Sequence, residues 1–122
     1  MDKSSVIFGN KIDAKTLAKA QNSKQKFIKR FGDDSKTVYH LGLEPIKQIE
    51  EIKIQNLVFS DEPLKLPDNP LIVGNIRMGF GHYRISMAIA SCAQALGFTP
   101  VWLDLASFDA AGSKMIRSQN DL

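Results

Sequence analysis

The chain has 122 residues, a net charge of +3 and 43% hydrophobic residues, a composition typical of one soluble globular domain. No apolar run reaches the roughly 18 residues needed to cross a bilayer, and the opening M-D-K-S-S-V-I-F-G-N lacks the apolar segment of a secretion signal. The single cysteine excludes an intramolecular disulfide. We therefore expect a cytoplasmic protein with a reduced cysteine.

The excess positive charge lies mainly between Lys11 and Lys36. A solvated helix face accounts for such a run, and attraction to an anionic surface is the alternative. Aromatic residues that stack on bases are scarce in this stretch, where Phe27 and Phe31 stand alone, so we do not expect nucleic-acid binding. Peripheral contact with anionic lipid head groups stays open.

Residues 1–62 predict a small α+β segment. Asn10 or Asp13 can cap its first helix, Gly32 can end that helix, and Pro45 fits the first turn of a second one. The expected elements are, in chain order, a helix at 11–31, a β-prone run at 37–41, a helix at 44–51 and a strand at 52–59.

The stretch P-L-K-L-P-D-N-P at residues 63–70 predicts a linker, because proline cannot donate to a sheet and disfavours helix before it. Residues 71–122 then predict the opening of a Rossmann-like domain. The expected elements are a buried strand at 71–76, a helix at 83–96 ended by Gly97, a strand at 100–105 and a helix from 108–116. The strand, helix, strand order predicts a βαβ unit.

The predicted fold class is therefore α/β, with a βαβ unit after a small N-terminal segment. A doubly wound sheet normally has more strands than this chain shows. We expect either the opening of a larger protein or a small domain that takes strands from its own N-terminal segment. An incomplete sheet leaves an exposed edge, which predicts self-association.

The connector at residues 74–82 has the sequence G-N-I-R-M-G-F-G-H. It contains charged, aromatic and histidine side chains that a simple turn between a strand and a helix does not require. Gly79 and Gly81 permit positive φ angles and close backbone approach, and the helix that follows offers free N–H groups to an anion. A P-loop is excluded because no G-K-[ST] follows. A dinucleotide fingerprint lacks its third glycine, since Arg84 occupies that place, although Asp104 stands where the ribose-binding acid is expected.

Gly79-Phe80-Gly81-His82, with Ala88-Ile89 on the helix and V-W-L-D-L on the next strand, resembles the opening βαβ unit of GT-B glycosyltransferases. The group most similar in pattern contains monogalactosyldiacylglycerol synthase and MurG. The resemblance covers roughly residues 70–108, about a third of the chain. It implies an N-terminal domain that binds the glycosyl acceptor.

Carried over, the resemblance implies that Gly79, Gly81 and His82 contact the acceptor or its phosphate. It assigns proton transfer or orientation to His82. Apart from the resemblance, Arg84 in the first turn of the predicted helix and Arg77 at the strand end are candidate phosphate ligands, since an anion offsets the unfavourable position of a cation at a helix start. The family loop is usually richer in glycine. The apolar Met78 and Phe80 in this loop either face a lipid acceptor or simply pack.

A GT-B enzyme needs a second domain for its nucleotide sugar, which 122 residues cannot contain. The resemblance therefore implies an N-terminal fragment whose C-terminal domain is missing and which is inactive alone. A Rossmann-type module that binds a nucleotide or phosphate without transferase activity is the alternative. A third possibility is a partial product that only folds or associates.

The remaining candidates receive structural interpretations. Cys92 lies on the predicted apolar helix face and is expected in the core. Trp102 is expected in the core or an interface, and His40 in a weak strand. No spacing of histidine, cysteine or acidic residues resembles a metal site, and we expect neither a metal nor a cofactor.

Overall fold

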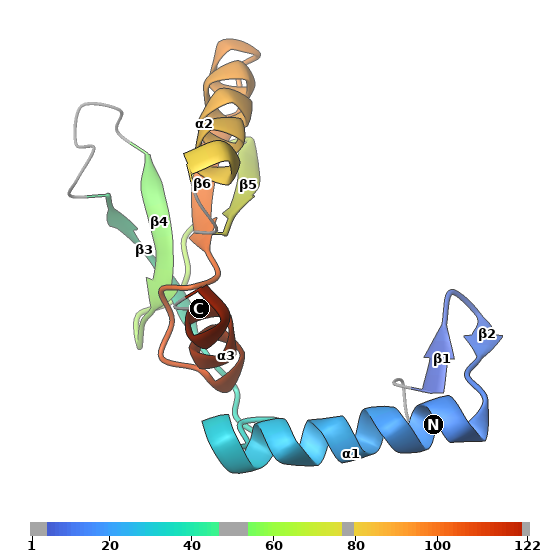
Figure 1. The fold of residues 1–122 in the computed structure, drawn as a ribbon. Helices are drawn as coiled ribbons and strands as arrows, with labels where there is room; N and C mark the ends of the chain where they lie inside the picture. Colours follow the sequence, from blue (N-terminus) through green and yellow to red (C-terminus); the bar gives the residue numbers. More distant parts are fainter. Residues whose placement is uncertain (1–4, 47–53, 77–79, 121–122) are drawn as a thin grey trace.

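The computed structural model describes residues 5–46, 54–76 and 80–120, with the backbone alone for Phe80. It is a mixed α/β structure, in which three helices accompany a small hairpin and a larger sheet (Figure 1). The elements are β1 (Val6–Ile7), β2 (Asn10–Lys11), α1 (Ala14–Phe31), β3 (Leu41–Pro45), β4 (Gln55–Phe59), β5 (Pro70–Asn75), α2 (Phe80–Ala95), β6 (Thr99–Asp104) and α3 (Ala111–Asn120).

The larger sheet has the strand order β3-β4-β6-β5. β5 and β6 are parallel neighbours joined through α2, so the predicted βαβ unit is confirmed. β4 runs parallel to β6 and antiparallel to β3. The sheet therefore combines strands from both sides of residues 63–70, as expected for a small domain that takes strands from its own N-terminal segment.

The core lies between α2 and one face of the sheet. Ile54, Val73, Ala90 and Trp102 form its buried cluster. Ala90 is only 1% exposed, because its small side chain lets the helix lie close to the strands.

The helical spacing of apolar residues predicts a buried face made of Ile85, Ala88, Ile89, Cys92, Ala93 and Leu96. Of these six, Ala93 alone is buried. Ile85, Ile89 and Leu96 are 61%, 49% and 72% exposed, and Cys92 is exposed rather than in the core. The residues that α2 buries are small: Ser86, Ala90 and Ala93. Hydrophobicity alone pointed to the wider apolar stripe, whereas close approach to a sheet selects small side chains.

Two N-terminal predictions are also corrected. Residues 37–40 form no strand, and β3 begins only at Leu41. The predicted helix at 44–51 starts inside β3, where Glu44 and Pro45 pair with β4. Residues 47–51 of this prediction lie outside the described residues. Strand pairing, invisible to local propensity, decides this region, and an edge strand tolerates Pro45 at its end.

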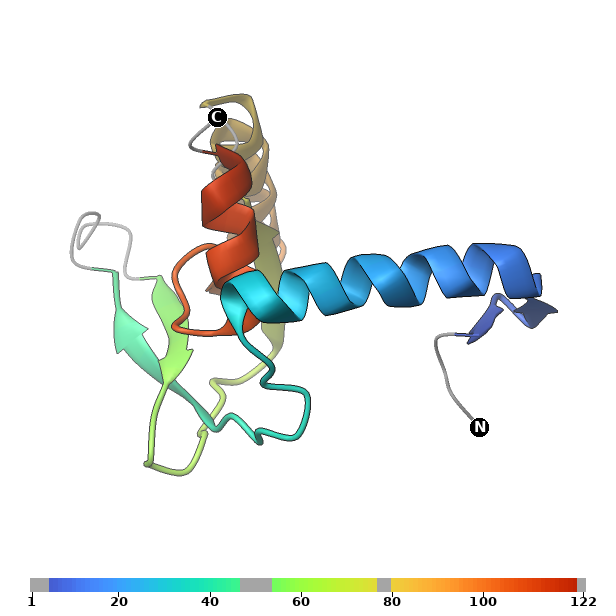
Figure 2. The same cartoon turned by 60° about the horizontal axis from the view of Figure 1, so that its bottom comes forward.

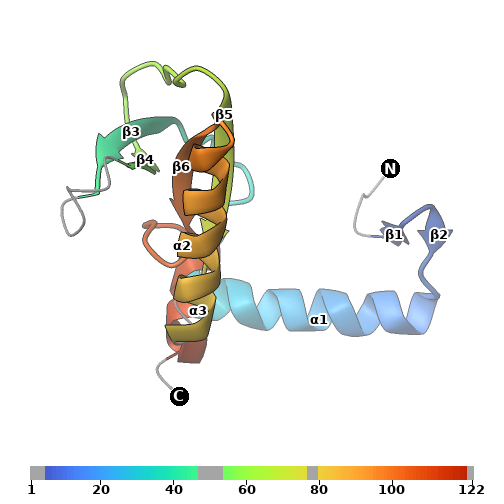
Figure 3. The ribbon, with the colours of Figure 1, turned by 90° about the horizontal axis from the view of Figure 1, so that it is seen from above.

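Helix α1 extends away from the rest of the molecule, and its C-terminal end lies beside α3 (Figures 1, 2 and 3). It buries no residue. Asp13, one of the two predicted caps, is its N-cap and accepts a 2.9 Å hydrogen bond from the Thr16 amide. The β1–β2 hairpin lies near its N-terminal end (Figure 1).

Candidate functional site

Two buried polar residues end the parallel strands of the βαβ unit. Asn75 closes β5 and Asp104 closes β6, each only 3% exposed, and the two are partners in the ladder. The Leu105 amide donates to the Asn75 carbonyl at 3.2 Å, which extends the pairing past the strand ends. Ligands of open α/β sheets bind beyond this end of the strands.

Ser86 ties α2 to this edge of the sheet. Its hydroxyl donates to the Gly74 carbonyl at 3.1 Å and lies 3.4 Å from Asn75 Oδ1. Asp104 Oδ1 accepts a 3.0 Å hydrogen bond from the Ala106 amide and so initiates the turn that follows β6. These contacts hold the second turn of α2 and the loop after β6 against the strand ends.

The first turn of α2 presents an exposed surface above this edge. Gly81 and His82 lie in that turn and Arg84 just after it, and all three are exposed. Gly81 has a helical backbone rather than the positive φ that the sequence suggested, and nothing lies within 4 Å of the Cβ position. The first N–H groups of a helix lack intrahelical partners, so this turn suits an anion.

The predicted site residues are thus placed unevenly. Gly81, His82 and Arg84 share one end of α2, whereas Asp104 is buried at the end of β6. Arg77 and Gly79, and with them Met78, lie outside the described residues.

Sequence reasoning missed Asn75 and Ser86. A signal existed for Asn75, because a polar residue that closes the apolar run L-I-V-G-N marks a strand end as clearly as Asp104 does. Ser86 gave no local signal, since serine within a helix is ordinary and its partner lies on another element.

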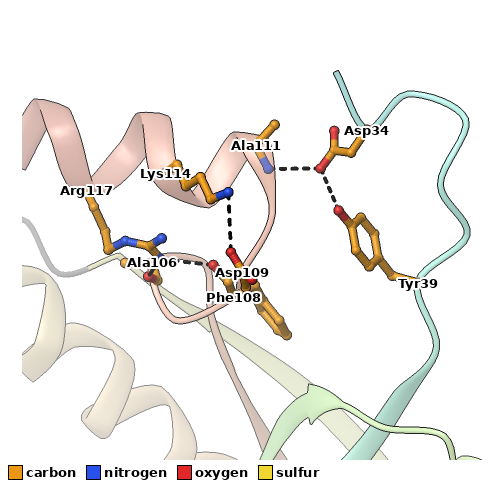
Figure 4. A network of polar contacts seen from close by, with 8 residues as sticks. All are labelled: Asp34, Tyr39, Ala106, Phe108, Asp109, Ala111, Lys114 and Arg117. Carbon is orange, nitrogen blue, oxygen red and sulfur yellow. Dashed lines mark hydrogen bonds and ion pairs between the residues drawn. The ribbon is translucent and has the colours of Figure 1, made fainter. Parts of the chain in front are cut away.

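Helix α3 holds the loop after β6 in place (Figure 4). Arg117 donates from one nitrogen to the carbonyls of Ala106 and Phe108, at 2.6 and 2.9 Å. Lys114 and Asp109 form an ion pair at 3.4 Å, which is exposed and contributes little. The two bonds from Arg117 close the loop on the helix that follows it.

Asp34 joins the N-terminal half of the chain to α3 (Figure 4). Its Oδ2 accepts hydrogen bonds from the Ala111 amide at 2.9 Å and from the Tyr39 hydroxyl at 2.8 Å. Asp34 thereby satisfies a free donor at the start of α3. The Ala111 amide first, and the Tyr39 hydroxyl second, lower the pKa of Asp34 below its usual 3.8.

Two grooves lie away from the strand ends. One, of about 480 Å³, lies between α1 and α3 and is lined mainly by apolar residues, including Phe27, Phe31 and Met115. The other, of about 460 Å³, is lined by Tyr39, His40 and residues 61–64. Neither contains a predicted site residue. The His40 carbonyl accepts from the Ser60 amide at 3.0 Å, although residue 40 belongs to no strand.

Within residues 5–46, 54–76 and 80–120, no cluster of three or more histidine, cysteine or acidic residues is arranged to hold a metal ion. Over the same part of the chain, no helix combines the length and apolarity that crossing a membrane requires. A family model described as a domain of unknown function, DUF6937, matches residues 6–122. No curated protein and no solved structure matches the chain.

Proposed function

We propose a function for this chain, which belongs to the DUF6937 family: it forms the acceptor-binding part of a GT-B-like glycosyltransferase. The observation that carries the proposal is the exposed His82 in the first turn of α2, above the carboxyl ends of β5 and β6. His82 accepts the proton of an acceptor hydroxyl while that oxygen attacks the anomeric carbon of a nucleotide sugar and the nucleoside diphosphate leaves. A further domain holds the nucleotide sugar, so this chain alone is inactive.

Arg84 and the helix start favour an acceptor that carries a phosphate. A cation near a helix N-terminus is unfavourable by roughly 0.3–1 kcal/mol, because it faces the positive end of the dipole. A bound phosphate reverses that effect for Arg84 and also accepts from the free N–H groups of the turn. In this proposal, Arg77 and Gly79 also bind the acceptor phosphate.

Helix α1, which projects from the rest of the molecule, favours a lipid acceptor at a membrane surface. At 100° per residue, Lys15, Lys19, Lys26 and Lys29 share one face of α1, and no acidic residue lies within the helix. Such basic amphipathic helices bind anionic lipid surfaces.

The hairpin beside α1 adds an apolar tip. Phe8 is 100% exposed and has a φ of 49°, in a two-residue turn with Gly9. A bulky residue rarely adopts this conformation, and insertion into a bilayer offers a reason to expose it.

The competing function is a Rossmann-type module that binds a nucleotide or a phosphate group without glycosyl transfer. The two functions differ in ligand. The acceptor part binds a lipid and leaves the nucleotide sugar to another domain, whereas the Rossmann-type module binds a free dinucleotide.

Trp102 provides the assay, because it is the only tryptophan of the chain and packs edge-on against Tyr83 in the first turn of α2, with 5.9 Å between ring centroids. Its fluorescence is recorded during titration with dihexanoyl phosphatidylinositol, which carries both a phosphate and free hydroxyl groups, and with dihexanoylglycerol, NAD and UDP-glucose. We expect saturable binding of phosphatidylinositol, and no response to either nucleotide. His82→Ala should weaken lipid binding about tenfold, the equivalent of about 1.4 kcal/mol.

His40→Ala is the matched control, because it removes the other histidine of the chain, which lies outside the candidate site. It should leave binding unchanged. Micromolar binding of NAD or UDP-glucose overturns the acceptor proposal in favour of the nucleotide module. Lipid binding that His82→Ala does not weaken, or no lipid binding at all, also overturns it.

A further inference from the structure

An apolar stripe on α2 has no partner among the described residues. Ile85, Ile89 and Cys92 recur at the spacing of one helix face, and Leu96 continues this face in the turn just after the helix, where its amide bonds to the Cys92 carbonyl at 3.1 Å. All four residues are exposed. Ile85 is 61% exposed and Leu96 is 72% exposed. A contiguous stripe of this kind marks an interaction surface more often than scattered apolar residues do.

The stripe lies on the outer side of β5. Residues three apart on a helix step round its axis by about 60°. Tyr83 packs against Trp102 of β6, and Ser86, the next step, bonds to Gly74 of β5. Ile89 and Cys92 are each a further step of about 60° round the helix axis in the same direction. Their side chains therefore lie beyond β5, on the side away from β6.

β5 is also an open edge of the sheet. It pairs with β6 on one side, and no strand of the described residues pairs with its other side. Its sequence P-L-I-V-G-N contains no charge, and Ile72 is 56% exposed. Edge strands of soluble monomers are normally protected by charges, prolines or bulges. β5 has a proline only at its first residue, Pro70, and its register with β6 contains no bulge.

The whole chain exposes more surface than its mass requires. Its accessible surface is 9568 Å², whereas a compact monomer of 13.6 kDa exposes about 6,600 Å². The projecting α1, which buries no residue, accounts for part of this excess of about 3,000 Å² per chain. Obligate homodimers bury about 2,000–5,000 Å² in total, or about 1,000–2,500 Å² on each copy, which this excess can supply.

We propose that a second copy of this chain covers the β5–α2 face, with the β5 strands of the two copies paired antiparallel about a twofold axis. An axis perpendicular to the sheet keeps both copies of α2 on the same side of the joined sheet. The apolar stripe of each α2 then meets that of its partner copy across the axis. An uncharged edge and an apolar stripe are complementary to themselves, as a twofold interface requires.

This inference does not depend on the proposed glycosyl transfer. It is tested on the full chain by sedimentation velocity between about 1 and 100 µM, with Ile89→Glu as the disrupting variant. We expect a dimer for the wild type and a monomer for Ile89→Glu, because two buried carboxylates would face each other near the axis. Val38→Glu is the control, since Val38 is 77% exposed in a loop outside this face, and it should stay dimeric.

Cys92 supplies an independent readout, because it is the only cysteine and lies within the stripe. Its alkylation by iodoacetamide should slow as the wild-type concentration rises, and should be fast at every concentration in Ile89→Glu. Circular dichroism confirms that each variant is folded. A wild-type monomer at 100 µM overturns the proposal, and so does a species larger than a dimer. A dimer that survives Ile89→Glu, or alkylation independent of concentration, overturns the assigned face.

Discussion

The closest approach in the β3–β4 region offers a sharp test of the structure through Gly42→Ala. A Cβ atom at Gly42 would lie 2.6 Å from Ser60 Cβ and 2.8 Å from Ser60 Oγ. Carbon atoms normally pack at about 3.5 Å or more, so the two residues must separate by about 0.9 Å. Ser60 Cβ cannot rotate away, and the Ser60 amide is bonded to the His40 carbonyl at 3.0 Å. The backbone must therefore shift, which costs about 1–3 kcal/mol of stability.

Urea denaturation at one fixed protein concentration measures this cost. Gly74→Ala is the matched control, because it is another strand glycine but has nothing within 4 Å of its Cβ position; its stability should change by less than about 0.5 kcal/mol. Adding Ser60→Gly to Gly42→Ala removes both clashing atoms and should recover about 1 kcal/mol or more in a double-mutant cycle. Equal stability of the two alanine variants would refute the close packing of residues 42 and 60.

Three further outcomes are expected. Asp34→Ala should unfold at lower urea concentration than the wild type at neutral pH. Because hydrogen bonds lower the pKa of Asp34 in the folded state, this difference in stability should hold above the unfolded pKa of 3.8 and vanish as the pH falls through the lower folded pKa. A difference that stays constant down to about pH 2 contradicts these hydrogen bonds. Val101→Ala should cost about 1.5–3 kcal/mol by urea denaturation, because Val101 is 0% exposed and loses two methyl groups, and a loss below about 0.5 kcal/mol would place it outside the core. Asp13→Ala should lower the helical circular dichroism signal, because Asp13 Oδ1 caps Thr16 at 2.9 Å; an unchanged signal would mean that α1 does not depend on this cap.

The elements built from local signals were predictable. A cap at Asp13 and a stop at Gly32 bracket α1, and a buried strand followed by an alanine-rich helix predicted β5 and α2. The predicted ends of these elements differ from the observed ones by only a few residues. Local hydrogen bonds and hydrophobic spacing are enough to specify such elements.

The parts that depend on distant contacts were not predictable. β3 starts at Leu41 because its residues pair with those of β4. The β-propensity of a short segment does not reveal which other segment it pairs with. The buried face of α2 depends on how closely the helix approaches the sheet. The small Ala90 is therefore buried and the larger Ile89 is exposed. Ser86 belongs to the candidate site through a bond to Gly74, a contact that exists only once the βαβ unit has formed.

Helix α1 buries no residue, so little packing holds it in its helical state. Most of the stability of helices in proteins comes from the packing of an amphipathic face, which α1 largely lacks. Lys15 and Lys19, and again Lys26 and Arg30, are like charges four residues apart, and each such pair costs roughly 0.2–0.5 kcal/mol. Anions that screen these pairs remove that cost. The helix content of α1 should therefore rise with ionic strength and with anionic surfaces, which makes it the part of the fold whose order depends most on the solution around it.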